Sequence, residues 1–145
     1  MRLASCSIVA AAALGACTPT HRAPEFIAAG PGPIRPFSPA ARVQGLLYLS
    51  GQIGTDSTGR VVSGGIQPET RQAMENIRGV LLKNGSSLDR VFKCTVFLAD
   101  MKEWAAMNDV YVTFFDPARR PTRSAMGTSG LALDARVEIE CIAAE

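Results

Sequence analysis

The pattern of hydrophobic and polar residues changes along the chain between the period of a strand and the period of a helix. Apolar residues three and four positions apart predict helices at residues 68–84 and 103–115. Pro68 suits the start of the first helix, and Gly85 suits the position after its end. Runs rich in β-branched and aromatic residues predict strands at 43–50, 60–63, 90–100, 122–128 and 135–143, and residues 25–28 could form an earlier edge strand. Strands mixed with two helices indicate an α+β fold.

The last predicted strand separates apolar from charged side chains by strict alternation. Val137, Ile139 and Cys141 face one way, whereas Arg136, Glu138 and Glu140 face the other. We expect the apolar set to lie under the two helices and the charged set to lie on the opposite sheet face. Residues 90–100 are apolar on both faces, so the second face also needs a cover. Another copy of the chain, in a cyclic oligomer, is the expected cover.

Length and composition limit the classes of function. The chain has 145 residues, which suits one domain with its own core. Its formal net charge is +2 with both signs mixed, so we expect no nucleic-acid partner. His21 is the only histidine and lies in a proline-rich segment. We therefore do not expect a Ser-His-Asp triad, a Cys-His dyad or a multi-histidine metal site.

The N-terminal residues have the pattern of a signal peptide. Residues 8–16 form an apolar run that is too short to span a bilayer of about 30 Å. The small residues before Cys17 resemble the lipobox of bacterial lipoproteins, in which this cysteine carries the lipid. An ordinary signal peptide cut nearby is the less favoured alternative. We therefore expect export to the periplasm and a lipid anchor on Cys17, with the outer membrane favoured because Thr18 and not Asp follows.

The predicted signal peptide at residues 1–16 divides the chain into three parts. Prolines are frequent between residues 18 and 39. Residues 17–29 are predicted to be a tether, and residues 30–145 the folded domain. Within the domain, Cys94 and Cys141 allow two interpretations. They could pair in an oxidising compartment, but the absence of a CxxC motif or a nearby histidine favours two buried, reduced thiols.

Several motifs resemble those of the RidA (YjgF-type) reactive-intermediate deaminases. Residues 121–125 (PTRSA) and 137–140 (VEIE) together look like the signature of that family. Further similarity covers the early SGQ segment at 49–54, the first helix at 72–77, the central strand at 91–100 and the second helix at 104–111. The motifs occur in the right order across residues 30–143.

The resemblance implies an α+β, chorismate-mutase-like mixed sheet with two helices on one face, assembled as a homotrimer with clefts between subunits. It also implies hydrolysis of small 2-imino and 2-enamino acids to 2-keto acids and ammonia, with no metal or cofactor. Arg123 maps to the arginine that binds the substrate carboxylate, and Glu138 maps to the glutamate that handles protons and water. Positions that map to substrate binding are Phe37, Ser50, Gly51, Asn108 and Ala125.

Other interpretations remain open on the sequence alone. Arg123 could be a surface charge, and Glu138 could form an ion pair with Arg136 or Arg123. Ala125 stands where the family often has Cys, and Phe37 where it often has Tyr. These departures and the export signal favour an alternative function, a non-catalytic module that binds a small carboxylate at the subunit interface. A membrane-tethered protein-interaction subunit is a third hypothesis.

Overall fold

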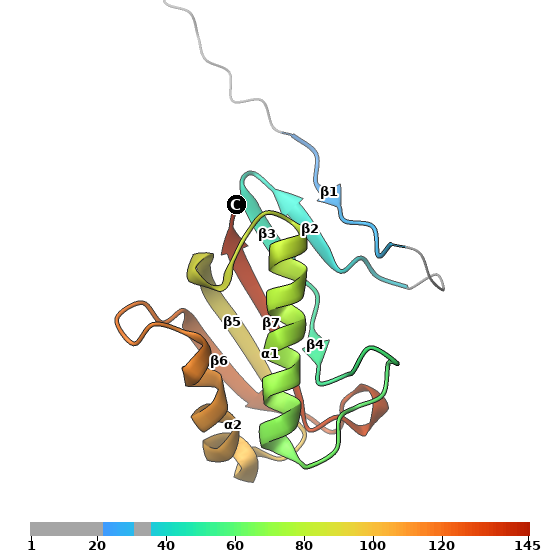
Figure 1. Ribbon diagram of the computed structural model, residues 1–145, viewed down its shortest axis with the longest axis vertical. Coiled ribbons are helices and arrows are strands. Elements are labelled where there is room, and N and C mark those ends of the chain that lie inside the picture. The colour runs from blue at the N-terminus through green and yellow to red at the C-terminus, as the bar shows by residue number, and fades with distance from the viewer. Residues whose placement is uncertain (1–21, 31–35) are drawn as a thin grey trace, which may run out of the picture.

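The structure is a computed structural model that describes residues 22–30 and 36–145. The predicted signal peptide, Cys17 and part of the predicted tether lie outside the described residues, as do residues 31–35. Two helices lie on one face of a mixed sheet, which confirms the expected α+β architecture (Figure 1). Among the described residues, no helix is both long enough and apolar enough to cross a membrane.

The sheet has β7 near its centre. Its strands run in the order β1-β2-β3-β7-β5-β6, and β4 also pairs with β7. The pairing of β5 with β6 is parallel and the other pairings are antiparallel, so the sheet is mixed. The strands are β1 (Glu25–Phe26), β2 (Ala40–Val43), β3 (Leu46–Leu49), β4 (Gln52–Ile53), β5 (Val91–Leu98), β6 (Thr122–Gly127) and β7 (Val137–Ala144).

The two helices cover the apolar face of this sheet. Helix α1 spans Ile66–Lys83 and helix α2 spans Trp104–Tyr111, with a short 3-10 turn on either side of α2. Ala73, Ile77 and Leu81 are fully buried in the core, as their helical spacing predicts. The apolar residues of β7 meet them from the sheet side, while Glu138 is only half-buried and Glu140 is exposed.

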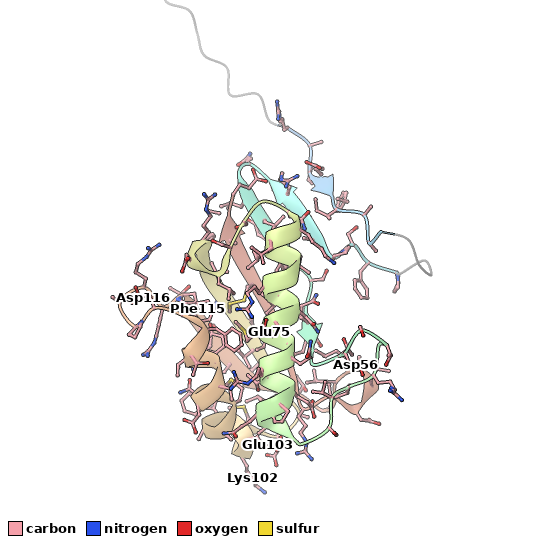
Figure 2. All side chains as sticks on the ribbon, in the orientation of Figure 1. Asp56, Glu75, Lys102, Glu103, Phe115 and Asp116 are labelled. Atoms are coloured by element: carbon pink, nitrogen blue, oxygen red, sulfur yellow. A yellow bond between two sulfur atoms is a disulfide. The ribbon has the colours of Figure 1, made fainter. Side chains whose placement is uncertain are left out.

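Arg136 does not share the face of Glu138 and Glu140, so its predicted position is wrong. It lies just before β7, and its backbone N–H donates to Glu69 Oε2 at 2.8 Å. The Arg136 guanidinium then pairs with Glu103 at 2.6 Å and lies 3.8 Å from Glu69. Glu103 lies at the end of the molecule where α1 begins (Figure 2). These helix carboxylates draw the side chain to their own side of the sheet.

The strand predicted at residues 43–50 corresponds to β3, which begins only at Leu46 and pairs in a hairpin with an additional strand, β2. Gln44 and Gly45 connect the two strands with φ angles of 50° and 79°. Two consecutive residues with positive φ form the tight turn that matches the twist of antiparallel strands. Of the predicted strand at 60–63, only an isolated bridge between Thr55 and Val61 forms.

A bulge in β5 breaks the predicted alternation of that strand. The pairing with β7 shifts between Val91 and Lys93, so that the side chain of Phe92 is 44% exposed. Val91 is buried with the residues that face the helices. The extra residue of a bulge reverses the side to which the earlier side chains point.

Cys94 and Cys141 form a disulfide, so the favoured interpretation of two reduced thiols is wrong. They lie directly opposite each other on β5 and β7, with Cα atoms 4.1 Å apart. Both are buried in the core. Because 47 residues separate them along the chain, only the register of the two strands brings them together.

Candidate functional site

Arg123 lies on the edge strand β6 and points toward helix α2. Its register partner on β5 is Cys94, which belongs to the helix-facing core. The Arg123 Nη1 donates a 2.8 Å hydrogen bond to Asn108 Oδ1 on α2. The Arg123 Cζ also lies 5.6 Å from the ring centroid of Trp104 and 4.7 Å from that of Tyr111. We call Arg123, Trp104, Asn108 and Tyr111 the arginine cluster.

The charge of the arginine cluster has no counter-ion in the described part of the chain. No described carboxylate forms an ion pair with Arg123, which is held only by an amide oxygen and two ring faces. The Tyr111 hydroxyl is buried and has no hydrogen-bond partner among the described residues. Burial raises the pKa of Tyr111 to about 12, against the lowering effect of the Arg123 charge. The phenol is therefore neutral and the cluster carries one positive charge.

Glu138 lies in a second group of predicted site residues, on β7. It is opposite Ile53 of β4 and Phe97 of β5. Its carboxylate packs against Gly51, where an added Cβ would lie 1.9 Å from Glu138 Oε1. Glycine at position 51 therefore leaves the space that the carboxylate occupies. No described residue forms a hydrogen bond or an ion pair with this carboxylate, so the alternative of a structural ion pair to Arg136 or Arg123 is wrong within one chain.

Ser50 and Phe37 lie beside Gly51, around an open hollow of about 610 Å³. The Ser50 Oγ donates to the Ser38 carbonyl at 2.7 Å and ties the segment before β2 to the end of β3. This hollow brings together three of the residues predicted to bind substrate. The carboxylate in its lining is Glu140, while Glu138 contacts Gly51. We call Glu138, Gly51, Ser50 and Phe37 the glutamate cluster.

The two clusters occupy opposite faces of the sheet. Arg123 and the half-buried Ala125 share the face that α2 covers, whereas Glu138 shares a face with Phe97. One chain therefore does not bring Arg123 and Glu138 together. Asn108 lies with Arg123, to which its Oδ1 is hydrogen-bonded.

Trp104 and Tyr111 also belong to the arginine cluster, although no motif of the sequence marked them as site residues and their spacing is typical of the apolar face of a helix. The spacing of positions 104, 108 and 111 places them on one helix face with Asn108, and this was the available signal. Tyr111 is indeed buried, but Trp104 is 39% exposed. Among the described residues, no group of three or more His, Cys, Asp or Glu side chains is placed to hold a metal ion.

Comparisons with known proteins match nearly the whole fold. A family model described as Endoribonuclease L-PSP matches residues 27–145. A RutC family protein from Pyrococcus horikoshii is 43% identical, over 81% of this chain and 94% of that protein. The 2-iminobutanoate/2-iminopropanoate deaminase of Mus musculus is 40% identical, over 79% of this chain and 85% of the mouse protein. The crystal structure of E. coli TdcF with bound serine has a TM-score of 0.74 and 31% identity, and covers 83% of this chain and 98% of that one.

A single α+β unit with two helices on one face of a mixed sheet is also the fold of the matching solved structures. The chain belongs to the Endoribonuclease L-PSP family, which is the RidA (YjgF-type) family that its motifs resemble. The expected family and fold are therefore confirmed.

Proposed function

We propose that this protein is an imine and enamine deaminase that hydrolyses small 2-imino acids to 2-keto acids and ammonia. The observation that carries the proposal is the Arg123 guanidinium, held in place by Asn108 and two aromatic rings without a carboxylate partner among the described residues. A partly buried cation of this kind favours an anionic ligand, and the planar fork of arginine suits a carboxylate. Relatives from mouse and human named as 2-iminobutanoate/2-iminopropanoate deaminases support this substrate class.

The proposed chemistry uses Arg123 to hold the substrate carboxylate and Glu138 to move protons. Glu138 transfers a proton as the enamine becomes the imine. It then takes a proton from water while the water oxygen adds to the C=N carbon. Glu138 returns this proton to the imine nitrogen, which gives the carbinolamine. It then carries the hydroxyl proton to the same nitrogen, so that ammonia leaves as the C–O bond becomes a carbonyl. Such imines also hydrolyse in water, so holding the reactants in position supplies much of the needed acceleration.

We propose that the protein assembles as a homotrimer, which is typical of its family. Because the arginine and glutamate clusters lie on opposite faces, Arg123 of one subunit must meet Glu138 of the partner subunit. The sheet face away from the helices also exposes apolar side chains, with Phe92 44% and Met126 45% exposed. Burial of such a surface by another subunit is favourable. Light scattering coupled to gel filtration tests this proposal, and a monomer at micromolar concentration contradicts it.

We propose that the protein works outside the cytoplasm, attached through lipid on Cys17. The disulfide between Cys94 and Cys141 supports export, because disulfides persist mainly in oxidising compartments. Labelling of cells with radioactive palmitate should mark the protein, and Cys17→Ala should abolish the label while leaving the protein exported. Unlabelled parent protein in the soluble periplasmic fraction would favour an ordinary signal peptide.

The central experiment measures imine hydrolysis by the form that lacks residues 1–17, which keeps every described residue. An amino-acid oxidase generates the 2-imino acid, and semicarbazide traps the fraction that remains. We expect the parent to reduce the trapped imine and Arg123→Ala to abolish this effect. Arg120→Ala is the matched control, because Arg120 is an exposed arginine three residues away. Equal activity in Arg123→Ala and the parent would refute the carboxylate-binding role.

Two variants separate the carboxylates of β7. Glu138→Gln keeps the shape of the side chain and removes its proton-transfer ability, so we expect kcat to fall at least about 100-fold. Glu140→Gln is the matched comparison, two residues further along the same strand face, and we expect a smaller loss. The reverse order would assign the chemistry to Glu140, which lines the hollow beside Ser50. Carboxylate binding without hydrolysis by either parent or variant would favour the non-catalytic binding module.

A further inference from the structure

The guanidinium of Arg123 lies against one face of α2 that is built from three side chains. Trp104, Asn108 and Tyr111 are spaced by four and three residues, which places them in line on one side of the helix. The Arg123 Cζ lies 5.6 Å from the Trp104 ring centroid and 4.7 Å from the Tyr111 ring centroid. Both distances are within the range of about 6 Å for an attractive cation–π contact.

We propose that Trp104 and Tyr111 are positioning residues that hold the Arg123 guanidinium ready for a carboxylate, and that Tyr111 acts through its ring face and not through its hydroxyl. The kinetic test of this inference rests on the proposed function. The second test requires only that Arg123 binds a carboxylate. Neither residue was assigned to the site on sequence grounds, and neither is expected to touch the reacting atoms.

This arrangement leaves most of the N–H donors of Arg123 available to bind a ligand. A guanidinium has five N–H donors. Within the described residues, Arg123 uses one of its nitrogens, Nη1, in the hydrogen bond to Asn108. Ring faces hold the cation without consuming its N–H groups, since the attraction comes from the electron density of the ring. Two parallel N–H groups therefore remain for a bidentate carboxylate.

The two rings beside the Arg123 guanidinium differ in how deeply they are buried. Tyr111 is 3% exposed and forms the inner wall, whereas Trp104 is 39% exposed and forms the outer wall. The Tyr111 ring is itself supported by Phe115, with 5.1 Å between the ring centroids. The inner wall is therefore fixed by the core, and the guanidinium is confined between a rigid ring and a surface ring.

The described structure assigns no role to the Tyr111 hydroxyl. It is buried without a hydrogen-bond partner among the described residues, which is an unfavourable state for a hydroxyl. Burial also keeps its pKa at about 12, so that it stays neutral and does not pair with the cation as a phenolate. Phenylalanine at this position keeps the ring and removes the unpaired group.

The kinetic test compares variants in the imine assay with the form that lacks residues 1–17. Trp104→Leu and Tyr111→Leu should raise KM by about fivefold each, because a cation–π contact of about 1 kcal/mol that holds the Arg123 guanidinium acts on substrate and transition state alike. Their kcat should stay within about twofold of the parent value. Tyr111→Phe keeps the ring, so its KM should rise less than the KM of Tyr111→Leu. Phe114→Leu is the matched control, since its ring lies 6.0 Å from a different arginine, Arg78.

A purely structural role predicts a different result. Partial unfolding reduces the number of active molecules, so it lowers the apparent kcat and leaves KM unchanged. That outcome for both leucine variants would overturn the proposal. An equal rise of KM in Tyr111→Phe and Tyr111→Leu would also overturn it, because the hydroxyl would then be the active group. Trp104→Leu keeps the test valid if Tyr111→Leu does not fold, since Trp104 is partly exposed.

The second test does not depend on imine hydrolysis. Trp104 is the only tryptophan of the chain, so its fluorescence reports directly on the surroundings of Arg123. Titration with 2-oxobutanoate should change the emission of the parent in a saturable way and should leave the emission of Arg123→Ala unchanged. Tyr111→Leu should raise the apparent Kd about fivefold, and Tyr111→Phe, which keeps the ring, should raise it less. A response without deaminase activity would refute the proposed function alone, whereas no saturable response in the parent would overturn the positioning role.

Discussion

Loss of the disulfide between Cys94 and Cys141 should lower the stability of the protein by several kcal/mol. The bridge joins β5 to β7 and closes a loop of 47 residues in the unfolded chain. The chain-entropy relation gives about 4 kcal/mol at 25 °C for a loop of this length, and measured values are commonly about 2–4 kcal/mol. Small domains have a net stability of about 5–15 kcal/mol, so this is a large share.

The assay is a guanidinium titration of the form that lacks residues 1–17, in which Cys94 and Cys141 are the only cysteines. The parent is measured oxidised, and again after reduction in denaturant and refolding with reductant. Protein concentration stays constant because the stability of an oligomer depends on it. The expected loss in the free energy of unfolding is about 2–4 kcal/mol. Reductant should have no effect on the control variant Cys94→Ala/Cys141→Ala.

Two results would refute this reasoning. Two free thiols in the oxidised preparation after denaturation would mean that the bridge does not form. A loss smaller than about 0.5 kcal/mol, in a preparation with no free thiols, would mean that the unfolded loop is already constrained or that the bridge strains the sheet.

Three further predictions test the site and its frame. Gly51→Ala should displace the Glu138 carboxylate and lower kcat about 100-fold. The stability should fall by less than about 1 kcal/mol, because the end of the Glu138 side chain is flexible and can move away. An unchanged kcat would contradict the contact between Gly51 and Glu138. Ionisation of Tyr111 changes the ultraviolet absorbance, and the part of the change that is missing in Tyr111→Phe should appear only near pH 12, because burial raises the pKa of Tyr111 from 10.0 to about 12. The same shift stabilises the folded protein below pH 10, and this stabilisation is lost as the pH rises toward 12. Glu69→Ala should lower the free energy of unfolding by about 1–3 kcal/mol, because it removes the buried acceptor of the Arg136 N–H. Arg136→Ala should lower it less, because the Arg136 side chain is half exposed. Urea titration compares the two variants, and equal losses would refute the ranking.

Much of the candidate site was predictable because its residues belong to short sequence motifs. Arg123 follows Pro121 in a recognisable segment, and Glu138 belongs to a strand whose alternation is visible in the sequence. The arrangement of these residues was not predictable in the same way. Their placement on opposite sheet faces depends on the register of β6 and β7 with β5. The partners of Arg123 on α2 depend on how that helix lies across the edge strand.

The sequence by itself determined the features that depend on local periodicity. The apolar stripe of Ala73, Ile77 and Leu81 defined α1, and the alternation along β7 defined its buried face, because side-chain direction repeats every 3.6 residues in a helix and every two in a strand. Tertiary structure alone decided the pairing of Cys94 with Cys141, the bulge in β5 and the position of Arg136. Each of these depends on which distant residue lies opposite, and the energy of that choice is shared by the whole sheet.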